Sequence, residues 1–200
     1  METLRNLPPA AWALVAAAIV VGWILAWAFG AYRSRSARKA LLSTVTAAGT
    51  DHLADVLVPD GMGGFFHLDF VLLTPAAILV IDLRDVAGNI FGGDQMTEWT
   101  VMDGSQRFTF TNPQGALYDR IAAVRAVTGE VPVEGRIVFT RRGKFPKGLP
   151  KWTLMVDSLK TEFPNVEHAG HTSHFREQWQ RLRDSVSPSE MNQARPLSVR

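Results

Sequence analysis

The 200-residue sequence predicts an α/β domain, with a mixed β-sheet flanked by helices, behind a single N-terminal transmembrane helix. Three observations support this fold class. Residues 9–32 are apolar and contain no charged residue. Short apolar runs of strand length, separated by turn signals, fill residues 52–111. From residue 112 to residue 186, segments with helical spacing alternate with strand-like segments, which is typical of an α/β arrangement.

The charge-free segment 9–32 is predicted to be a retained membrane anchor. It exceeds the roughly 20 apolar residues that a helix needs to cross the hydrocarbon core. Trp12, Trp27 and Tyr32 lie near its ends, where interfacial aromatic residues are common. The alternative is a cleaved signal peptide, but the apolar core of such a peptide is only about 7–15 residues long.

Basic residues predict the orientation of this anchor. Arg33, Arg35, Arg38 and Lys39 follow the apolar segment, whereas only Arg5 precedes it. The positive-inside rule then places the N-terminus outside and the remaining chain in the cytoplasm, as in a single-pass protein of the plasma or inner membrane. The lipid bilayer is therefore an expected partner, since the same basic residues can lie against anionic headgroups.

The charge of the remaining chain gives no support for a broad basic surface. The whole sequence carries a net charge of +2, with 21 Lys and Arg against 19 Asp and Glu. Five of the basic residues but only one acidic residue lie before position 40, so the rest of the chain is slightly acidic. The sequence contains no cysteine, which excludes disulfides and thiolate metal sites.

Residues 66–84 are predicted to form the central hairpin of the domain. Two apolar runs flank Thr74–Ala77, where Pro75 indicates a turn. A turn centred on Pro75 and Ala76 places Asp69 opposite Asp82 and His67 opposite Arg84. Apolar residues surround these four, so we expect the two carboxylates beside a core. There they need a metal, a shared proton or a cation.

The segments before this hairpin are assigned from their caps and turns. Residues 36–48 are expected to be helical, with Ser36 as a possible N-cap and Gly49 as the end. His52–Pro59 is expected to be a strand and residues 60–64 a glycine-rich turn.

After the hairpin, three short strands are expected before a helix. They are residues 88–93, 97–102 and 106–111, the last two joined by an Asp-Gly turn. Asn112-Pro113 begins a helix at 114–128, because proline suits the first helical turn and the apolar residues recur at helical spacing.

The last third of the chain is expected to continue the alternation. The predicted elements are a strand at 133–140, a basic loop at 141–151, a strand at 152–156, a short helix or turn at 158–163, and a helix at 175–186 that packs through Trp179 and Leu182.

The order of these landmarks resembles a known family. The run from His67 to Gly93, followed by Glu98-Trp99 and by Phe110–Gln114 before a helix, resembles the NERD (nuclease-related) domain, which is similar to the PD-(D/E)XK nucleases. That family has an acid at the start of a strand and an apolar strand ending in Glu-x-Lys. The matching positions here are Asp69, Asp82 and Arg84, with Gly88, Trp99, Asn112, Pro113 and Val138-Phe139 as later landmarks.

The resemblance implies a restriction-endonuclease-like core and metal-dependent cleavage of DNA or RNA. Asp69 and Asp82 would hold Mg²⁺ or Mn²⁺, and Arg84 would contact the phosphate as the third catalytic residue. Arg84 replaces the family lysine and is a poor proton shuttle, because a guanidinium group does not readily release its proton. Asp82 replaces the usual Glu, and Gln114 follows Asn-Pro sooner than the family glutamine does.

Five further residues are weaker candidates for substrate contacts. They are His67, Gln114, Arg141, Arg142 and Lys144. The alternative interpretation of His67 is a packed, hydrogen-bonded side chain, and that of the basic loop is a solvated surface. Asp69 and Asp82 likewise have an alternative, a salt-bridged cluster with Arg84 and His67 at the end of a sheet.

Three functions follow from these alternatives. The first is a membrane-anchored hydrolase that cleaves nucleic acid with magnesium, its activity retained or lost through the Arg84 replacement. The second is a non-catalytic membrane-tethered binding or scaffold module, and the third is a sensor with a structural cation. The expected organisation is a short N-terminal segment (1–8), the transmembrane helix (9–32), a basic linker (33–44), the NERD-like domain (45–160), a helical extension (161–186) and a disordered tail (187–200).

Overall fold

A computed structural model describes residue 23, residues 39–164 and residues 175–189. The chain divides into two compact units, Met1–Ser43 and Thr44–Arg200, and the description below concerns the second. The predicted membrane segment 9–32 lies outside the described residues, except for Trp23. In the part of the chain that is described, no helix is both long and apolar enough to cross a membrane.

A six-stranded mixed sheet forms the centre of the second unit. Its order is β10-β1-β2-β3-β7-β9. The first four strands pair antiparallel, whereas β7 and β9 run parallel to β3. The strands are β1 (Asp51–Pro59), β2 (Phe65–Leu73), β3 (Ile78–Arg84), β7 (Val133–Phe139), β9 (Thr153–Met155) and β10 (Ser187–Pro188).

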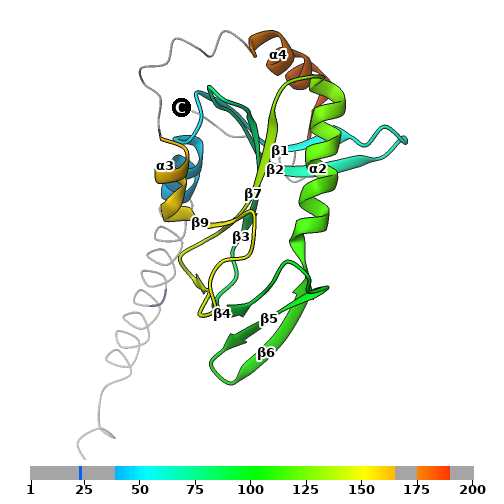
Figure 1. The fold of residues 1–200 in the computed structure, drawn as a ribbon. Coiled ribbons are helices and arrows are strands. Elements are labelled where there is room, and N and C mark those ends of the chain that lie inside the picture. Colours follow the sequence, from blue (N-terminus) through cyan, green and yellow to red (C-terminus); the bar gives the residue numbers. More distant parts are fainter. Residues whose placement is uncertain (1–22, 24–38, 165–174, 190–200) are drawn as a thin grey trace, which may run out of the picture. The chain divides into compact units, whose positions relative to one another are not determined.

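A second, smaller sheet lies beyond the end of β3 (Figure 1). Its order is β6-β5-β4-β8, and its strands are β4 (Gly88–Phe91), β5 (Glu98–Asp103), β6 (Gln106–Thr111) and β8 (Gly143–Lys144). The expectation of a mixed sheet in an α/β fold is therefore confirmed, but the strands divide into two mixed sheets, because the three strands after the hairpin pair with one another. The chain turns away from β3 at Gly88, whose φ of 105° favours glycine.

Helices cover both faces of the larger sheet. Helix α2 (Pro113–Thr128) begins at Asn112, whose side chain accepts a hydrogen bond from Gln114 N, and ends at Gly129. Gly135 of β7 faces α2, since a Cβ there would lie 2.5 Å from Ile121 Cδ1. The next residue, Arg136, contacts Glu162 of helix α3 (Leu159–Glu162) at 2.9 Å. Because neighbouring strand residues point to opposite faces, α2 and α3 lie on opposite sides of β7 (Figure 1).

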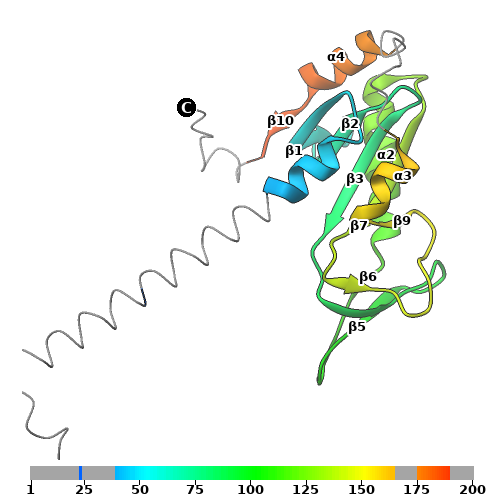
Figure 2. The same cartoon turned by 90° about the vertical axis from the view of Figure 1, so that its left-hand side faces the viewer.

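The C-terminal helix α4 (Arg176–Ser185) and strand β10 close the β1 edge of the sheet (Figure 2). Trp179 and Leu182 of α4 are buried, as expected from their spacing, and Trp179 Nε1 donates to Asp51 Oδ2 at 2.9 Å. A short 3-10 helix, η1 (Val156–Ser158), precedes α3.

The prediction that the tail is disordered from residue 187 was wrong for its first residues, 187–189. Ser187 pairs with Leu57 and Pro188 with Val56, so this segment adds an edge strand to β1. Proline is tolerated there because an edge strand has one side without a strand partner. Ser189 is only 5 % exposed. The rest of the predicted tail, residues 190–200, lies outside the described residues.

Aromatic side chains connect the two sheets in one core. Trp99 of β5 stacks on Phe139 of β7, with ring centroids 6.1 Å apart, and Phe145 packs edge-on against both rings. Trp99 is fully buried. The backbone of Gly92 lies against this indole, since a Cβ at Gly92 would be 2.4 Å from Trp99 Cδ2.

The same glycine-to-alanine change is therefore expected to have opposite effects at two positions. Gly92→Ala would press a methyl group into the buried indole and lower the free energy of unfolding by about 1–3 kcal/mol. Gly115→Ala meets open space in α2 and should stabilise the protein by up to about 1 kcal/mol. Chemical denaturation of both variants tests this, and equal stabilities would contradict the packing described here.

Candidate functional site

The predicted hairpin register is confirmed near the turn. Strands β2 and β3 pair from Leu73↔Ile78 to Phe70↔Ile81. The turn is closed by Thr74, whose backbone N–H donates to Ala77 O at 3.0 Å and whose hydroxyl donates to the same oxygen at 2.7 Å. The regular ladder ends one position before Asp69 and Asp82.

Beyond that point a side chain replaces the strand-to-strand bond. The backbone N–H of Leu83 donates to Asp69 Oδ2 at 2.9 Å. His67 pairs with Leu57 of β1, and the β3 ladder does not reach it. The expected pairing of His67 with Arg84 was therefore wrong. The two strands separate here because β2 stays with β1 while β3 stays with β7, where Arg84 pairs with Phe139.

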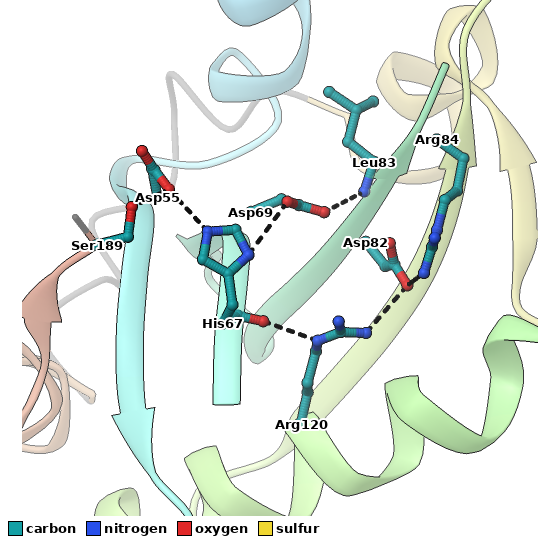
Figure 3. Close-up of polar contacts among 8 residues, drawn as sticks. All are labelled: Asp55, His67, Asp69, Asp82, Leu83, Arg84, Arg120 and Ser189. Carbon is teal, nitrogen blue, oxygen red and sulfur yellow. Dashed lines mark hydrogen bonds and ion pairs between the residues drawn. The ribbon is translucent and has the colours of Figure 1, made fainter. Parts of the chain in front are cut away.

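Asp82 is the most deeply buried charged group of the site. It is 2 % exposed, and its Oδ2 accepts hydrogen bonds from Arg84 Nη2 at 2.8 Å and Arg120 Nη1 at 3.1 Å (Figure 3). Arg120 belongs to α2 and also donates from Nε to His67 O at 2.8 Å. One guanidinium group thus connects α2 to both β2 and β3, and two guanidinium groups neutralise one buried carboxylate.

A second chain of contacts leads to Asp69. His67 Nε2 lies 2.7 Å from Asp55 Oδ1, and His67 Nδ1 lies 3.6 Å from Asp69 Oδ1. Ser189 Oγ donates to Asp55 Oδ1 at 2.5 Å (Figure 3). Asp55 has a φ of 55°, which is unusual for a strand residue and turns its backbone out of the regular β conformation. We call Asp55, His67, Asp69, Asp82, Arg84 and Arg120 the acid cluster.

Burial raises the pKa of the Asp69 carboxyl above its ordinary value, and the nearby Asp82 carboxylate acts in the same direction. The N–H of Leu83 opposes this shift, as do the positive charges of His67 and Arg120. The neutral form of Asp69 is therefore favoured more than in water, and a cation placed between the two acids would reverse that preference.

The donor set fits a hard divalent cation. Mg²⁺ prefers oxygen ligands and commonly uses one or two carboxylates, completing its coordination with water and phosphate oxygens. Asp82 Oδ1 makes no hydrogen bond to any described residue, and Asp69 Oδ1 has only the 3.6 Å approach of His67. Within the described ranges, no group of three or more His, Asp or Glu side chains could hold a metal, so two acids and water are the available ligands.

Gln114 lies in a different set of contacts from the acids. Its Nε2 donates to Asp94 Oδ1 at 3.0 Å and to Lys151 O at 2.8 Å. Its Oε1 accepts a hydrogen bond from Asn112 Nδ2. The Asn-Pro-Gln motif therefore connects the start of α2 to two loops.

Two arginines of the basic loop bind surface acids. Arg141 binds both carboxylate oxygens of Asp157, and Arg142 Nη1 donates to Asp85 Oδ2 at 2.8 Å. Lys144 is exposed on β8. None of these contacts involves a residue of the acid cluster, so the structure does not bring the three loop residues to Asp69 and Asp82.

Sequence reasoning missed Arg120, although the sequence contains a signal for it. Arg120 follows Leu117 by three positions and precedes Val124 by four, so it lies on the helix stripe that faces the sheet. A charged residue in that stripe needs a buried partner. Asp55 lay in an expected strand and was not among the candidate site residues, and Ser189 lay in a segment whose composition indicated disorder.

The pKa of Asp69 predicts a pH dependence of stability. A carboxyl whose folded pKa is raised stays protonated while the unfolded chain ionises, so folding loses free energy as the pH rises above about 3.8. The stability of the wild type relative to Asp69→Asn should therefore decrease with rising pH from that value and level off above the folded pKa. Denaturation of both proteins between pH 3.5 and pH 7 tests this. A difference that grows with pH would contradict it.

Comparison with known proteins identifies the family. No curated protein and no solved structure matches the chain. The family model of the nuclease-related domain matches residues 30–140, more than half of the chain. The match starts before the expected residue 45 and ends before the expected residue 160. It includes Asp55, Asp69, Asp82, Arg84 and Arg120, whereas Ser189 lies beyond it. The chain therefore belongs to the nuclease-related domain (NERD) family.

Proposed function

We propose that this chain is a membrane-anchored, nuclease-like hydrolase that cleaves phosphodiester bonds of DNA or RNA at the acid cluster. The observation that carries the proposal is the position of Asp69 and Asp82 at the point where β2 and β3 diverge, with Arg84 and Arg120 bound to Asp82. Membership of a nuclease-related family supports the same class of chemistry.

The two acids have one role in this proposal. Asp69 and Asp82 would hold Mg²⁺ or Mn²⁺ through the carboxylate oxygens that face away from the guanidinium groups. A divalent cation bound there supplies Lewis-acid polarisation of the phosphate and lowers the pKa of bound water. Asp82 is 2 % exposed, and this burial would strengthen its electrostatic interactions.

The two arginines have a separate role. Guanidinium groups match phosphate oxygens in charge and geometry, and they stay protonated at any working pH. Arg84 and Arg120 would therefore bind and stabilise the phosphate without moving protons. Arg84 Nε is buried and makes no hydrogen bond within the described structure, so this residue has a donor available beside the acids. An unmet buried donor is costly, and a phosphate oxygen would satisfy it.

The membrane anchor belongs to the proposal on sequence grounds alone. Residues 9–32 would span the bilayer, and the basic residues 33–39 would hold the domain on its cytoplasmic side. The plasma or inner membrane would then be the location and the lipid bilayer a permanent partner. The segment itself lies outside the described residues, apart from Trp23.

A specific contact favours a second candidate function. Asp82 already has two guanidinium partners, and one of them, Arg84, stands where the family has lysine. A carboxylate neutralised in this way needs no metal. The same fold would then serve as a non-catalytic, membrane-tethered binding or scaffold module.

Cation binding tests the site directly. Calorimetric titration of the full-length protein in detergent micelles with Mn²⁺ and with Mg²⁺ should show saturable binding. Asp69→Asn and Asp82→Asn should each abolish it, because each removes one of the two carboxylate ligands. Asp103→Asn is the matched control, since Asp103 is an exposed acid at the end of β5. Binding that survives at both cluster positions would rule out the metal site.

The role of Arg84 separates the two candidate functions. In a nuclease assay with Mn²⁺, Arg84→Ala should lower the cleavage rate roughly 100-fold, as the loss of one transition-state donor typically does. Arg84→Lys keeps the charge and should retain cleavage. Cleavage by Arg84→Lys alone would show that the native chain has lost an ancestral activity. Absence of cleavage in wild type and Arg84→Lys together would favour the scaffold function.

A further inference from the structure

Two exposed aromatic side chains are joined at the β9 edge of the larger sheet. Trp152, directly before β9, donates from Nε1 to the hydroxyl of Tyr118 in α2 at 2.8 Å. Trp152 is 42 % exposed and Tyr118 is 52 % exposed. The acid cluster uses the other flank of α2, where Arg120 reaches β2 and β3. This aromatic pair is therefore a separate feature from the acid cluster.

The indole of Trp152 is held rigidly although it is exposed. The guanidinium carbon of Arg136 lies 5.3 Å from the centre of this ring and 5.2 Å from that of Phe163. Arg136 is in turn fixed by ion pairs with Glu134 and Glu162. Trp152 also has a φ of 61°, a conformation that bulky side chains rarely adopt and that is often found at ligand sites.

The backbone before Trp152 is anchored by the Asn-Pro-Gln motif. Lys151 O accepts a hydrogen bond from Gln114 Nε2, and Lys151 N donates to Asp94 Oδ1 at 2.8 Å. Gln114 also binds Asp94, so the three groups form a closed set of contacts. Gln114, one of the weaker candidates for a substrate contact, thus fixes the backbone that precedes Trp152.

The exposed ring borders a surface hollow of about 480 Å³. The residues that line it are Arg136, Lys151, Trp152, Thr153, Leu154 and Glu162. Inside the hollow the charge of Arg136 is balanced by that of Glu162, which also lines it. At the rim, Lys151 is exposed and forms no ion pair among the described residues. A flat neutral group inside and an anion at the rim would complement this distribution.

We propose that this hollow, the Trp152 platform, binds an unpaired base of single-stranded nucleic acid. The base stacks against Trp152, and the adjoining phosphate contacts Lys151. Aromatic stacking accepts any base and is the usual means of holding single strands. The inference rests on the proposed function for its ligand class and assigns to the domain a strand-holding contact on the opposite flank of α2 from the acids.

Anisotropy of a fluorescent 12-nucleotide single strand of mixed sequence tests the platform. The full-length protein is used in detergent micelles with EDTA, so that no cation-dependent cleavage occurs. Trp152→Ala should weaken binding roughly 5- to 100-fold, the range expected for loss of one stacked base. Trp152→Phe should keep most of the affinity, because its ring still stacks. Phe108→Ala is the matched control at an exposed aromatic residue of β6, and it should bind like the wild type.

A second variant covers the case in which Trp152→Ala fails to fold. Lys151→Ala should weaken binding several-fold and reduce the salt dependence by about one ion, as the loss of one phosphate contact does. Wild-type affinity in folded Trp152→Ala, or unchanged salt dependence in Lys151→Ala, would overturn the proposal. So would an equal affinity for a duplex of the same length, or binding of no oligonucleotide at all.

The outcomes separate the platform from the acid cluster. Trp152-dependent binding of the single strand in a protein that binds no Mn²⁺ and cleaves nothing would support the platform and refute the nuclease proposal. Metal binding and cleavage, together with wild-type affinity in Trp152→Ala, would support the nuclease proposal and refute the Trp152 platform.

Discussion

The buried Asp82 carboxylate is the constraint on which the site depends. It lies on the central strand pair of the larger sheet, 2 % exposed, with Arg84 and Arg120 on one oxygen. Removing one partner of such a pair typically costs about 3–5 kcal/mol, because a buried charge is left without compensation. Arg120 also binds His67 O, so the same pairing fixes where α2 lies on the sheet. Arg120 thus both positions α2 on the sheet and neutralises Asp82.

That interaction also sets the conditions for chemistry. A phosphate that binds Arg84 and Arg120 competes with Asp82 for the same donors, and a cation that binds Asp82 competes with the arginines. Substrate and cation together would relieve this competition, because the phosphate takes the arginines while the cation takes the acids. Arg84 and Arg120 already neutralise Asp82 without them, so in the proposed nuclease either one alone would bind more weakly than both together. The proposed nuclease and scaffold functions differ in whether a phosphate replaces Asp82 as the partner of the arginines while a cation binds the acids.

Local patterns predicted most of the elements, but not how they combine. The hairpin 66–84, the Asn112 cap and the packed residues of α4 follow from turn, cap and spacing rules, and the structure confirms them. The second sheet and β10 could not be predicted, because strand pairing depends on contacts far apart in the sequence. Asp82 and Arg84 could be predicted because they lie two positions apart on one strand. Arg120 was missed, although its place in the apolar stripe of α2 indicated a buried partner.

The part of the chain beyond the family match completes the domain at two places. Ser189 follows β10 and binds Asp55, which continues through His67 toward Asp69. Lys151 and Trp152 precede β9 and are fixed by Gln114, which lies inside the matched region. Asp55 thus binds the segment that follows β10, which lies near the acid cluster. Gln114 binds the segment that precedes β9, which contacts α2 through Trp152. Sequence changes in these later segments would therefore alter the contacts of the acid cluster and of α2. They would leave the buried pairing of Asp82 with Arg84 and Arg120 unchanged.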